Sequence, residues 1–260
     1  MLTTSASYGA IAANLTRSMQ TVAAQPQVAR ETAYYLENIT SVKSIDDFLA
    51  DDRLFGYAMK AFGLGDMSYA KAFMRKVLTE GIADRNSFAN KLADTRYREF
   101  ADTFNFAELG STTTIFDVTR QGTVDRYHRQ SLEENAGSQD EGVRLALYFE
   151  RKAPTVTNPY GILADPALLK VVQTALNLPA TISLLDIDKQ AELISARLDI
   201  ADLKDPAKLA SFIRRFTHLW EITSPNQSAS GPAIAIGQPI HAGIGGALLA
   251  SLQNLKLGGS

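Results

Sequence analysis

The chain can be aligned with itself, and this internal similarity constrains its fold more than any other feature. Residues 25–106 match residues 139–222, with a shift of 114 positions at the start of the alignment. The first forty ungapped positions contain ten identities, and most of the other pairs exchange one apolar residue for another. The identical pairs are Gln25/Gln139, Arg30/Arg144, Tyr34/Tyr148, Val42/Val156, Leu49/Leu163, Ala50/Ala164, Asp51/Asp165, Leu54/Leu168, Ala61/Ala175 and Leu64/Leu178.

The two copies align again at their ends, where FADTFNF (100–106) matches FTHLWEI (216–222). They share a packing pattern, and no set of reactive groups is common to both. Two units are too few for a solenoid, so the pattern predicts an internally duplicated helical unit. We therefore divide the chain into an N-terminal tail, a first unit, a connector, a second unit and a C-terminal segment. Their bounds are 1–24, 25–106, 107–138, 139–222 and 223–260.

Apolar residues recur mainly at three- and four-residue spacing, which is typical of α-helices. One such stripe lies within 54–62, and a second, broad enough to face a core, lies within 209–220. Alternating runs are scarce, and the best strand candidate, Thr112–Val118, is short. We predict an all-α fold with about four to five helices in each unit and a further helix over Thr123–Asn135.

Residues that start helices recur at the expected places. Asp51 and Asp165 occupy the same position in the two units, and a cap is a simpler explanation for them than a metal or acid–base cluster. The acidic neighbours Asp46, Asp47 and Asp52 are not repeated in the second unit. Predicted caps and capping boxes are Ser44 with Asp47, Thr114 with Asp117, Ser138 with Glu141, Asp84, and Asp205 before Pro206. Helix ends are predicted at Gly63, Gly81 and Gly137.

The two ends of the chain are nearly uncharged. Residues 1–24 carry only Arg17, residues 223–260 carry only Lys256, and 225–239 is a Gly/Ser/Pro-rich linker. Each end has apolar residues at helical spacing, and an isolated helix of this kind is marginal in water. Each helix therefore docks on its own domain or frays, or it pairs with the other end or with another subunit. The candidate assembly stripes are Ile11, Leu15, Met19 and Val22, and Ile244, Leu248, Leu252 and Leu255.

The bulk composition excludes several classes of protein. A net charge of −2 creates no basic field, so nucleic acid is not an expected partner. The absence of cysteine removes disulfides and thiolate chemistry, and suits either the cytoplasm or a protein that crosses membranes unfolded. The N-terminal sequence has no features of a Sec signal, and no apolar run is long enough for a transmembrane segment.

Neither motifs nor residue clusters indicate catalysis. The histidines, His128, His218 and His241, are far apart and lie in no ligand spacing. No HExxH, Walker or GxSxG motif is present, and the glycines of 243–246 fit a helix start better than a phosphate loop. The aromatic residues of 97–106 are expected in the core rather than in base stacking. We predict no catalytic, cofactor-binding or metal-binding residues, no cofactor and no enzyme activity.

Four long segments resemble a known bacterial family. They are SVKSIDDFLADDRLFGYAMKAFGLGDMSYAKAFMRKVLTEG, SFANKLADTRYREFADTFNF, EENAGSQDEGVRLALYFERKAP and DIDKQAELISARLDIADLKDPAKLASFIRRFTHLWEI. Together they make the chain similar, over roughly 25–222, to the family catalogued as domain of unknown function 1217. That family is found mainly in alphaproteobacteria and is often encoded in flagellar gene clusters. The resemblance implies a flagellar context and carries no site residues to this chain.

Two hypotheses about function follow from this context. The first is a non-enzymatic structural or assembly protein of the flagellum or basal body. It would be exported without a Sec signal, and its terminal helices would bind flagellar components or other copies of the chain. The alternative is a cytoplasmic helical binding module, such as a flagellar export chaperone or regulator, that holds its substrate in a helix groove. An enzyme is the third and least supported class.

Overall fold

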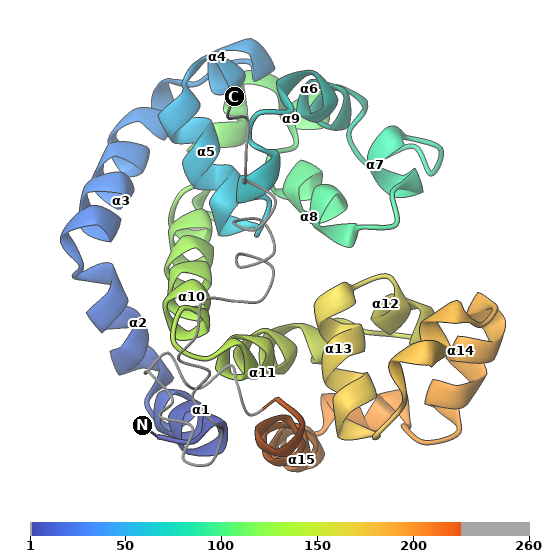
Figure 1. The fold of residues 1–260 in the computed structure, drawn as a ribbon. Coiled ribbons are helices and arrows are strands. Elements are labelled where there is room, and N and C mark those ends of the chain that lie inside the picture. Colours follow the sequence, from blue (N-terminus) through green and yellow to red (C-terminus); the bar gives the residue numbers. More distant parts are fainter. Residues whose placement is uncertain (1, 225–260) are drawn as a thin grey trace, which may run out of the picture. The chain divides into compact units, whose positions relative to one another are not determined.

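The computed structural model describes residues 2–224, and within that range the chain is all-α and has no strand (Figure 1). The all-α part of the predicted fold class is therefore confirmed. The candidate stripe Ile244, Leu248, Leu252 and Leu255 and His241 lie outside the described residues. The helices that precede the connector's long helix are α1 (Thr4–Ala13), α2 (Leu15–Ala23), α3 (Pro26–Asn38), α4 (Ile45–Ala50), α5 (Asp52–Ala61), α6 (Lys71–Glu80), α7 (Phe88–Lys91), α8 (Thr95–Thr103) and α9 (Phe106–Leu109). They are followed by α10 (Gln121–Gly137), α11 (Glu141–Lys152), α12 (Pro159–Leu163), α13 (Pro166–Ala175), α14 (Ile187–Ser195) and α15 (Pro206–Thr223).

Short 3-10 helices join many of these elements. They are η1 (Ile39–Ser41), η2 (Gly65–Met67), η3 (Gly110–Ile115), η4 (Asp117–Thr119), η5 (Ala153–Thr155), η6 (Ala180–Leu184) and η7 (Ile200–Lys204). The first predicted unit thus contains α3 to α8, one more helix than expected, because the four-residue α7 interrupts the segment after α6. The second unit contains α11 to α15, as expected.

The described residues form two hydrophobic cores. The first is built from α2 to α10, and its centre is aromatic, with Phe48 and Phe100 each 4.8 Å from Phe104 between ring centroids. The second is built from α11 to α15 together with Tyr8 of α1. The aromatic residues that the sequence assigned to the core are buried, since Phe100 and Phe104 are 0% exposed and Trp220 is 3% exposed.

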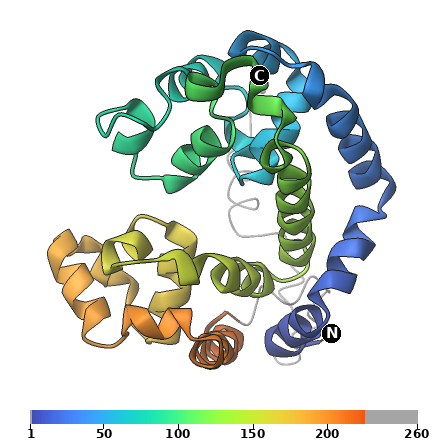
Figure 2. The ribbon, with the colours of Figure 1, turned by 180° about the vertical axis from the view of Figure 1, so that it is seen from behind.

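Helices α10 and α11 connect the two cores. Helix α10 contributes Val124, Tyr127 and Leu132 to the first core, and α11 contributes a row of residues from Val143 to Phe149 to the second. The two helices pack directly against each other. Seen from behind, α2 and α3 run alongside α10, and α1 lies beside α15 (Figure 2).

Local structure repeats at the spacing of the predicted duplication. Ser44 and Asn158, which are 114 positions apart, cap α4 and α12. Asp51 and Asp165 cap α5 and α13, and each carboxylate also accepts a hydrogen bond from a tyrosine 17 residues earlier, Tyr34 of α3 and Tyr148 of α11. The helices α5 and α13 both end before a residue with positive φ, Gly63 in one and Asn177 in the other. The common origin of the two units stays a prediction.

Some predicted helix starts are wrong, because other groups satisfy the backbone there. Thr114 and Asp117 form no capping box: Thr114 donates to the carbonyl of Val42, and the helix that follows begins only at Gln121. Ser138 does not cap α11, since Asp140 accepts from the N–H of Gly142 instead. In the first unit, Asp84 closes a turn through Asn86 and the capping residue is Asp94 at α8. The strand candidate Thr112–Val118 is not a strand: it contains the end of η3, Phe116 and the start of η4.

Candidate interaction surfaces and the junction of the two cores

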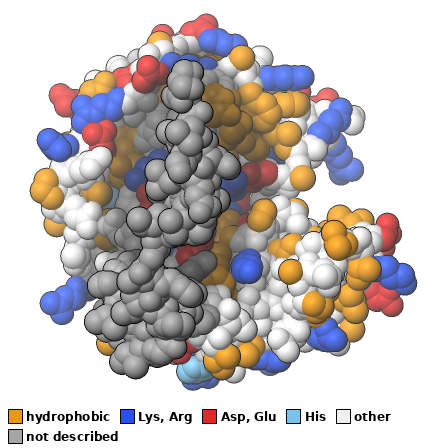
Figure 3. Space-filling model, in the orientation of Figure 1, with side chains coloured by type: hydrophobic (Ala, Val, Ile, Leu, Met, Phe, Trp, Pro, Cys, Tyr) orange, Lys and Arg blue, Asp and Glu red, His pale blue; other side chains and the backbone are white. Residues whose placement is uncertain are grey.

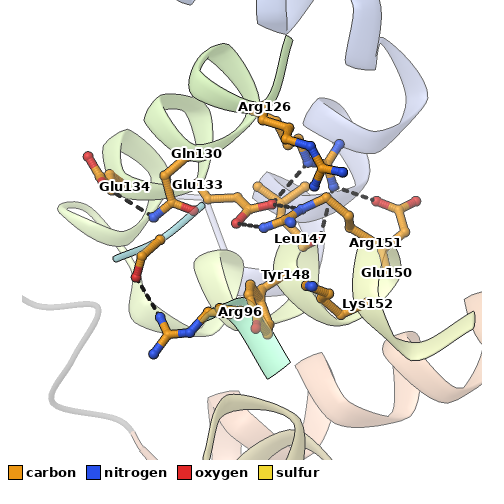
Figure 4. Close-up of polar contacts among 12 residues, drawn as sticks. Arg96, Arg126, Gln130, Glu133, Glu134, Leu147, Tyr148, Glu150, Arg151 and Lys152 are labelled. Carbon is orange, nitrogen blue, oxygen red and sulfur yellow. Dashed lines mark hydrogen bonds and ion pairs between the residues drawn. The ribbon is translucent and has the colours of Figure 1, made fainter. Parts of the chain in front are cut away.

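A buried ionic cluster lies at the junction of α10 and α11 (Figure 4). The side chain of Glu133 is 2% exposed and accepts hydrogen bonds from Arg129 at 3.0 Å and from Arg151 at 2.8 and 2.9 Å. Arg129 also donates to the carbonyl of Leu147 at 2.8 Å and lies 3.5 Å from a carboxylate oxygen of Glu150. Every member therefore has a charged or carbonyl partner, as a buried ion requires.

Further polar contacts extend the cluster toward both cores. Lys152 of α11 pairs with Glu99 of α8, which joins a helix of the second core to one of the first. On the other side, burial and the neighbouring carboxylate of Glu150 raise the pKa of Tyr8, so the phenol stays protonated. Because these groups pair with one another across α8, α10 and α11, the cluster holds these helices together.

The N-terminal stripe faces the protein's own interior. Val22 is 4% exposed within the first core, and Leu15 and Met19 pack against the same core. Ile11 packs against both cores. This arrangement favours docking on the same chain over assembly for these four residues, and it makes residues 4–23 part of the folded body.

Helix α1 sits against α11 and α15 through polar as well as apolar contacts. Thr4, which is fully buried, donates to a carboxylate oxygen of Asp140 at 2.5 Å. The N–H of Ser5 donates to Glu221 of α15 at 2.7 Å. Gly142 permits this approach, since a Cβ there would lie 2.5 Å from Nε1 of Trp220 and 2.8 Å from Cγ2 of Thr4. The sequence alone does not indicate that Gly142 makes room for α1.

The histidines of the described residues do not come together. His128 lies in α10, and its Nε2 is 3.3 Å from the hydroxyl of Thr32. Burial lowers the pKa of the imidazole, although the negative charge of Asp125 acts in the opposite direction. His218 lies in α15. In residues 2–224, no group of three His, Asp or Glu side chains could hold a metal ion. No helix in the same range is both long and apolar enough to cross a membrane.

The part of the connector that precedes α10 exposes large apolar side chains and buries several threonines. In the segment 112–119, Thr113, Thr114 and Thr119 are 0 to 1% exposed. The apolar residues of the same turn point to solvent, together with Leu109 just before it. We call these the connector patch: Leu109 (41% exposed), Ile115 (53%), Phe116 (42%) and Val118 (49%).

Hydrogen bonds of the buried threonines fix this inverted arrangement. The hydroxyl of Thr114 donates to the carbonyl of Val42 at 2.9 Å. Thr119 donates to the carbonyls of Thr113 and Phe116, and its own carbonyl accepts from the buried hydroxyl of Tyr35 at 2.5 Å. The turn is thus anchored on both sides of the patch. The sequence contains the residues of this turn, three consecutive threonines followed by Ile115, Phe116 and Val118, but local pattern alone predicts a strand there.

A second group of exposed apolar residues lies around η6 and α14. Hydrophobic side chains are visible on this face over α12 to α14 (Figure 3). We call the group the η6 patch: Tyr160 (46% exposed), Leu184 (85%), Leu185 (46%) and Ile187 (55%). Two side-chain hydrogen bonds involve residues of this patch. Gln190 donates to the carbonyl of Leu185, and the hydroxyl of Tyr160 donates to Asp188.

The described residues form an all-α protein with two hydrophobic cores and exposed apolar patches, and comparison with known proteins identifies its family. The model of the family described as "Protein of unknown function (DUF1217)" matches residues 61–209, more than half of the chain, which therefore belongs to that family. An X-ray crystal structure of a protein from Agrobacterium tumefaciens is 52% identical and has a TM-score of 0.79. The match covers 84% of this chain and 93% of that one. No curated protein matches.

Proposed function

We propose that the protein is a non-enzymatic structural or assembly component of the bacterial flagellum that acts through protein–protein contacts. The connector patch is the observation that carries the proposal. Large apolar side chains in solvent cost solubility, and here buried hydrogen bonds hold them outward, as expected for a preorganised binding surface. The flagellar setting is supported by the resemblance to a family often encoded in flagellar gene clusters, and the similar Agrobacterium protein comes from the bacterial class in which that family is mainly found.

We propose that two parts of the chain make the assembly contacts. The stripe Ile11, Leu15, Met19 and Val22 is occupied by packing within the chain. The proposed contacts are therefore the connector patch and the C-terminal stripe Ile244, Leu248, Leu252 and Leu255, whose sequence is apolar at helical spacing.

Localisation tests the proposal. The tagged protein is followed in cell, basal-body and culture fractions of strains with and without the flagellar export ATPase. We expect it in the basal-body or culture fraction only when the ATPase is present. Retention in the cell in both strains, with one dominant partner in pull-downs, would instead support a cytoplasmic export chaperone or regulator.

A matched pair of surface variants tests whether localisation depends on the connector patch. The variant Ile115→Thr/Val118→Thr removes apolar surface from the connector patch and leaves every buried threonine in place. The control, Leu184→Thr/Ile187→Thr, removes apolar surface from the η6 patch. We expect the first variant to fall several-fold in the flagellar fraction and the second to remain near the wild-type level. Equal levels for all three proteins would exclude the connector patch as the assembly surface.

A further inference from the structure

We propose that the connector patch binds the C-terminal apolar stripe, residues 244–255, of a second copy of this chain. The inference rests on the proposed function, because it assigns the assembly contact to two specific parts of the chain. The contact would be heterologous: a different surface of each copy takes part, so each bound copy leaves one patch and one stripe available.

The size of the patch indicates what kind of partner it fits. Four side chains at 41 to 53% exposure present on the order of 300 Å² of apolar surface, well below the ~800 Å² per partner of a stable interface between folded proteins. A surface of this size therefore fits a short segment rather than the face of a second folded body. A few apolar side chains on one face of a single helix would cover a surface of this size.

The sequence supplies a segment of that kind in every copy. After Ser224 the chain continues for 36 residues, from 225 to 260. Within them Ile244, Leu248, Leu252 and Leu255 recur at helical spacing, and the intervening residues are uncharged. The connector patch matches this character: between Leu109 and Thr119 the only charged side chain is Asp117. Contact between the two would bury no unpaired charge except at Asp117.

The linker is long enough for an exchange between copies. Residues 225–239 precede the stripe and can extend to roughly 50 Å at about 3.3 Å per residue. The segment leaves the body beside α1, where α15 bonds to Ser5. In an assembly, this reach lets the stripe of one copy meet the connector of its neighbour without deforming either body.

Disulfide trapping in the full-length protein tests the inference, because the chain has no cysteine of its own. One variant carries Asp117→Cys, between Phe116 and Val118, and another carries Ser251→Cys, within the stripe. The control, Asp66→Cys, replaces another exposed aspartate of a 3-10 helix, η2. Equal amounts of the Ser251→Cys protein and either partner are mixed and mildly oxidised, and the mixed dimer is quantified.

We expect at least tenfold more mixed dimer with Asp117→Cys than with Asp66→Cys. Adding Ile115→Thr and Val118→Thr, or Leu248→Ser and Leu252→Ser, should remove the difference. Equal yields for the two partners would overturn the inference, as would preferential formation of Asp117→Cys homodimers, which indicates patch-to-patch contact. These results are independent of localisation, so a failed flagellar assignment and a failed contact can be told apart.

Discussion

At the scale of single residues, the ionic contacts of this protein differ greatly in what they contribute. Glu133 lies out of solvent between two guanidinium groups, whereas its neighbour Glu134 pairs with Lys60 at the surface, where the two side chains are 42% and 35% exposed. Removing one member of a buried pair leaves an uncompensated charge in a poorly solvated site. Surface pairs are screened by water and contribute little. Two adjacent glutamates on one helix therefore provide a direct comparison.

Replacing Glu133 by glutamine should destabilise the protein strongly. The neutral amide cannot balance Arg129 and Arg151, and we expect a loss of about 3 kcal/mol in the free energy of unfolding. The control, Glu134→Gln, should cost less than about 0.5 kcal/mol. Urea denaturation followed by circular dichroism measures both. Similar midpoints for the two variants would show that the junction does not depend on the buried carboxylate.

The pKa of His128 predicts a pH dependence of stability. Burial lowers the pKa of this imidazole below its ordinary value of 6.5, so the unfolded chain binds the proton more readily than the folded one. Stability from the neutral side chain is thus fully present above pH 6.5 and is lost as the pH falls below that value. Between pH 7 and 5.5, the unfolding free energy of wild type should fall more steeply than that of His128→Gln. Parallel curves would contradict the assignment, since both proteins share all their carboxylates.

At the scale of secondary-structure elements, the docking of α1 depends on a missing side chain in α11. Gly142 lies where the Trp220 indole and the methyl group of Thr4 approach the helix backbone. Alanine is a better helix former than glycine, so helix propensity predicts that Gly142→Ala stabilises the protein. Packing predicts that the same substitution destabilises it, because the added Cβ would overlap Trp220 and Thr4. Gly56, in the middle of α5, has no atom within 4 Å of the place a Cβ would occupy. The substitution Gly56→Ala therefore isolates the effect of helix propensity.

We expect Gly142→Ala to destabilise the protein by about 1–3 kcal/mol, because the added methyl overlaps packed atoms. Gly56→Ala should stabilise it by up to about 1 kcal/mol. Trp220 is the only tryptophan of the chain, so the emission spectrum reports directly on the site. A red shift is expected for Gly142→Ala alone. Wild-type emission and stability in that variant would show that α1 and Trp220 adjust without cost.

At the scale of the whole molecule, the two ends of the chain have different relations to the folded body. The N-terminal segment contributes Tyr8 to one core and Val22 to the other, and Ile11 packs against both. All residues of the two described cores precede Ser224. The sequence presents the ends as similar, nearly uncharged segments, yet only one of them is needed to complete the described cores.

Truncation should separate these roles. Deleting residues 2–24 removes two buried apolar side chains, each worth roughly 1.5–3 kcal/mol, together with the hydrogen bonds of Thr4 and Ser5. We expect a markedly lower melting temperature or insoluble protein. Deleting residues 240–260 should leave the melting temperature within about 2 °C of wild type, because no described core residue is lost. Differential scanning calorimetry of wild type and the two deletion variants measures the melting temperatures. Equal destabilisation by both deletions would contradict the different roles of the two ends.

The sequence by itself determined the features that depend on neighbours along the chain. The helical period, the aspartate caps at Asp51, Asp165 and Asp205, and the burial of Phe100, Phe104 and Trp220 are confirmed. Caps and apolar periodicity act within one or two turns of helix, so a local pattern is sufficient to predict them.

Only the tertiary structure decided what the residues of the termini and the connector contact. Thr4 donates a hydrogen bond to Asp140, and Arg129 and Arg151 both pair with Glu133. The connector buries Thr113, Thr114 and Thr119, whereas it exposes Ile115 and Phe116. Each arrangement depends on a partner that the sequence pattern did not single out, such as the carbonyl of Val42 for Thr114. A polar side chain can be buried only where a hydrogen-bond partner is within reach, and folding brings that partner into place.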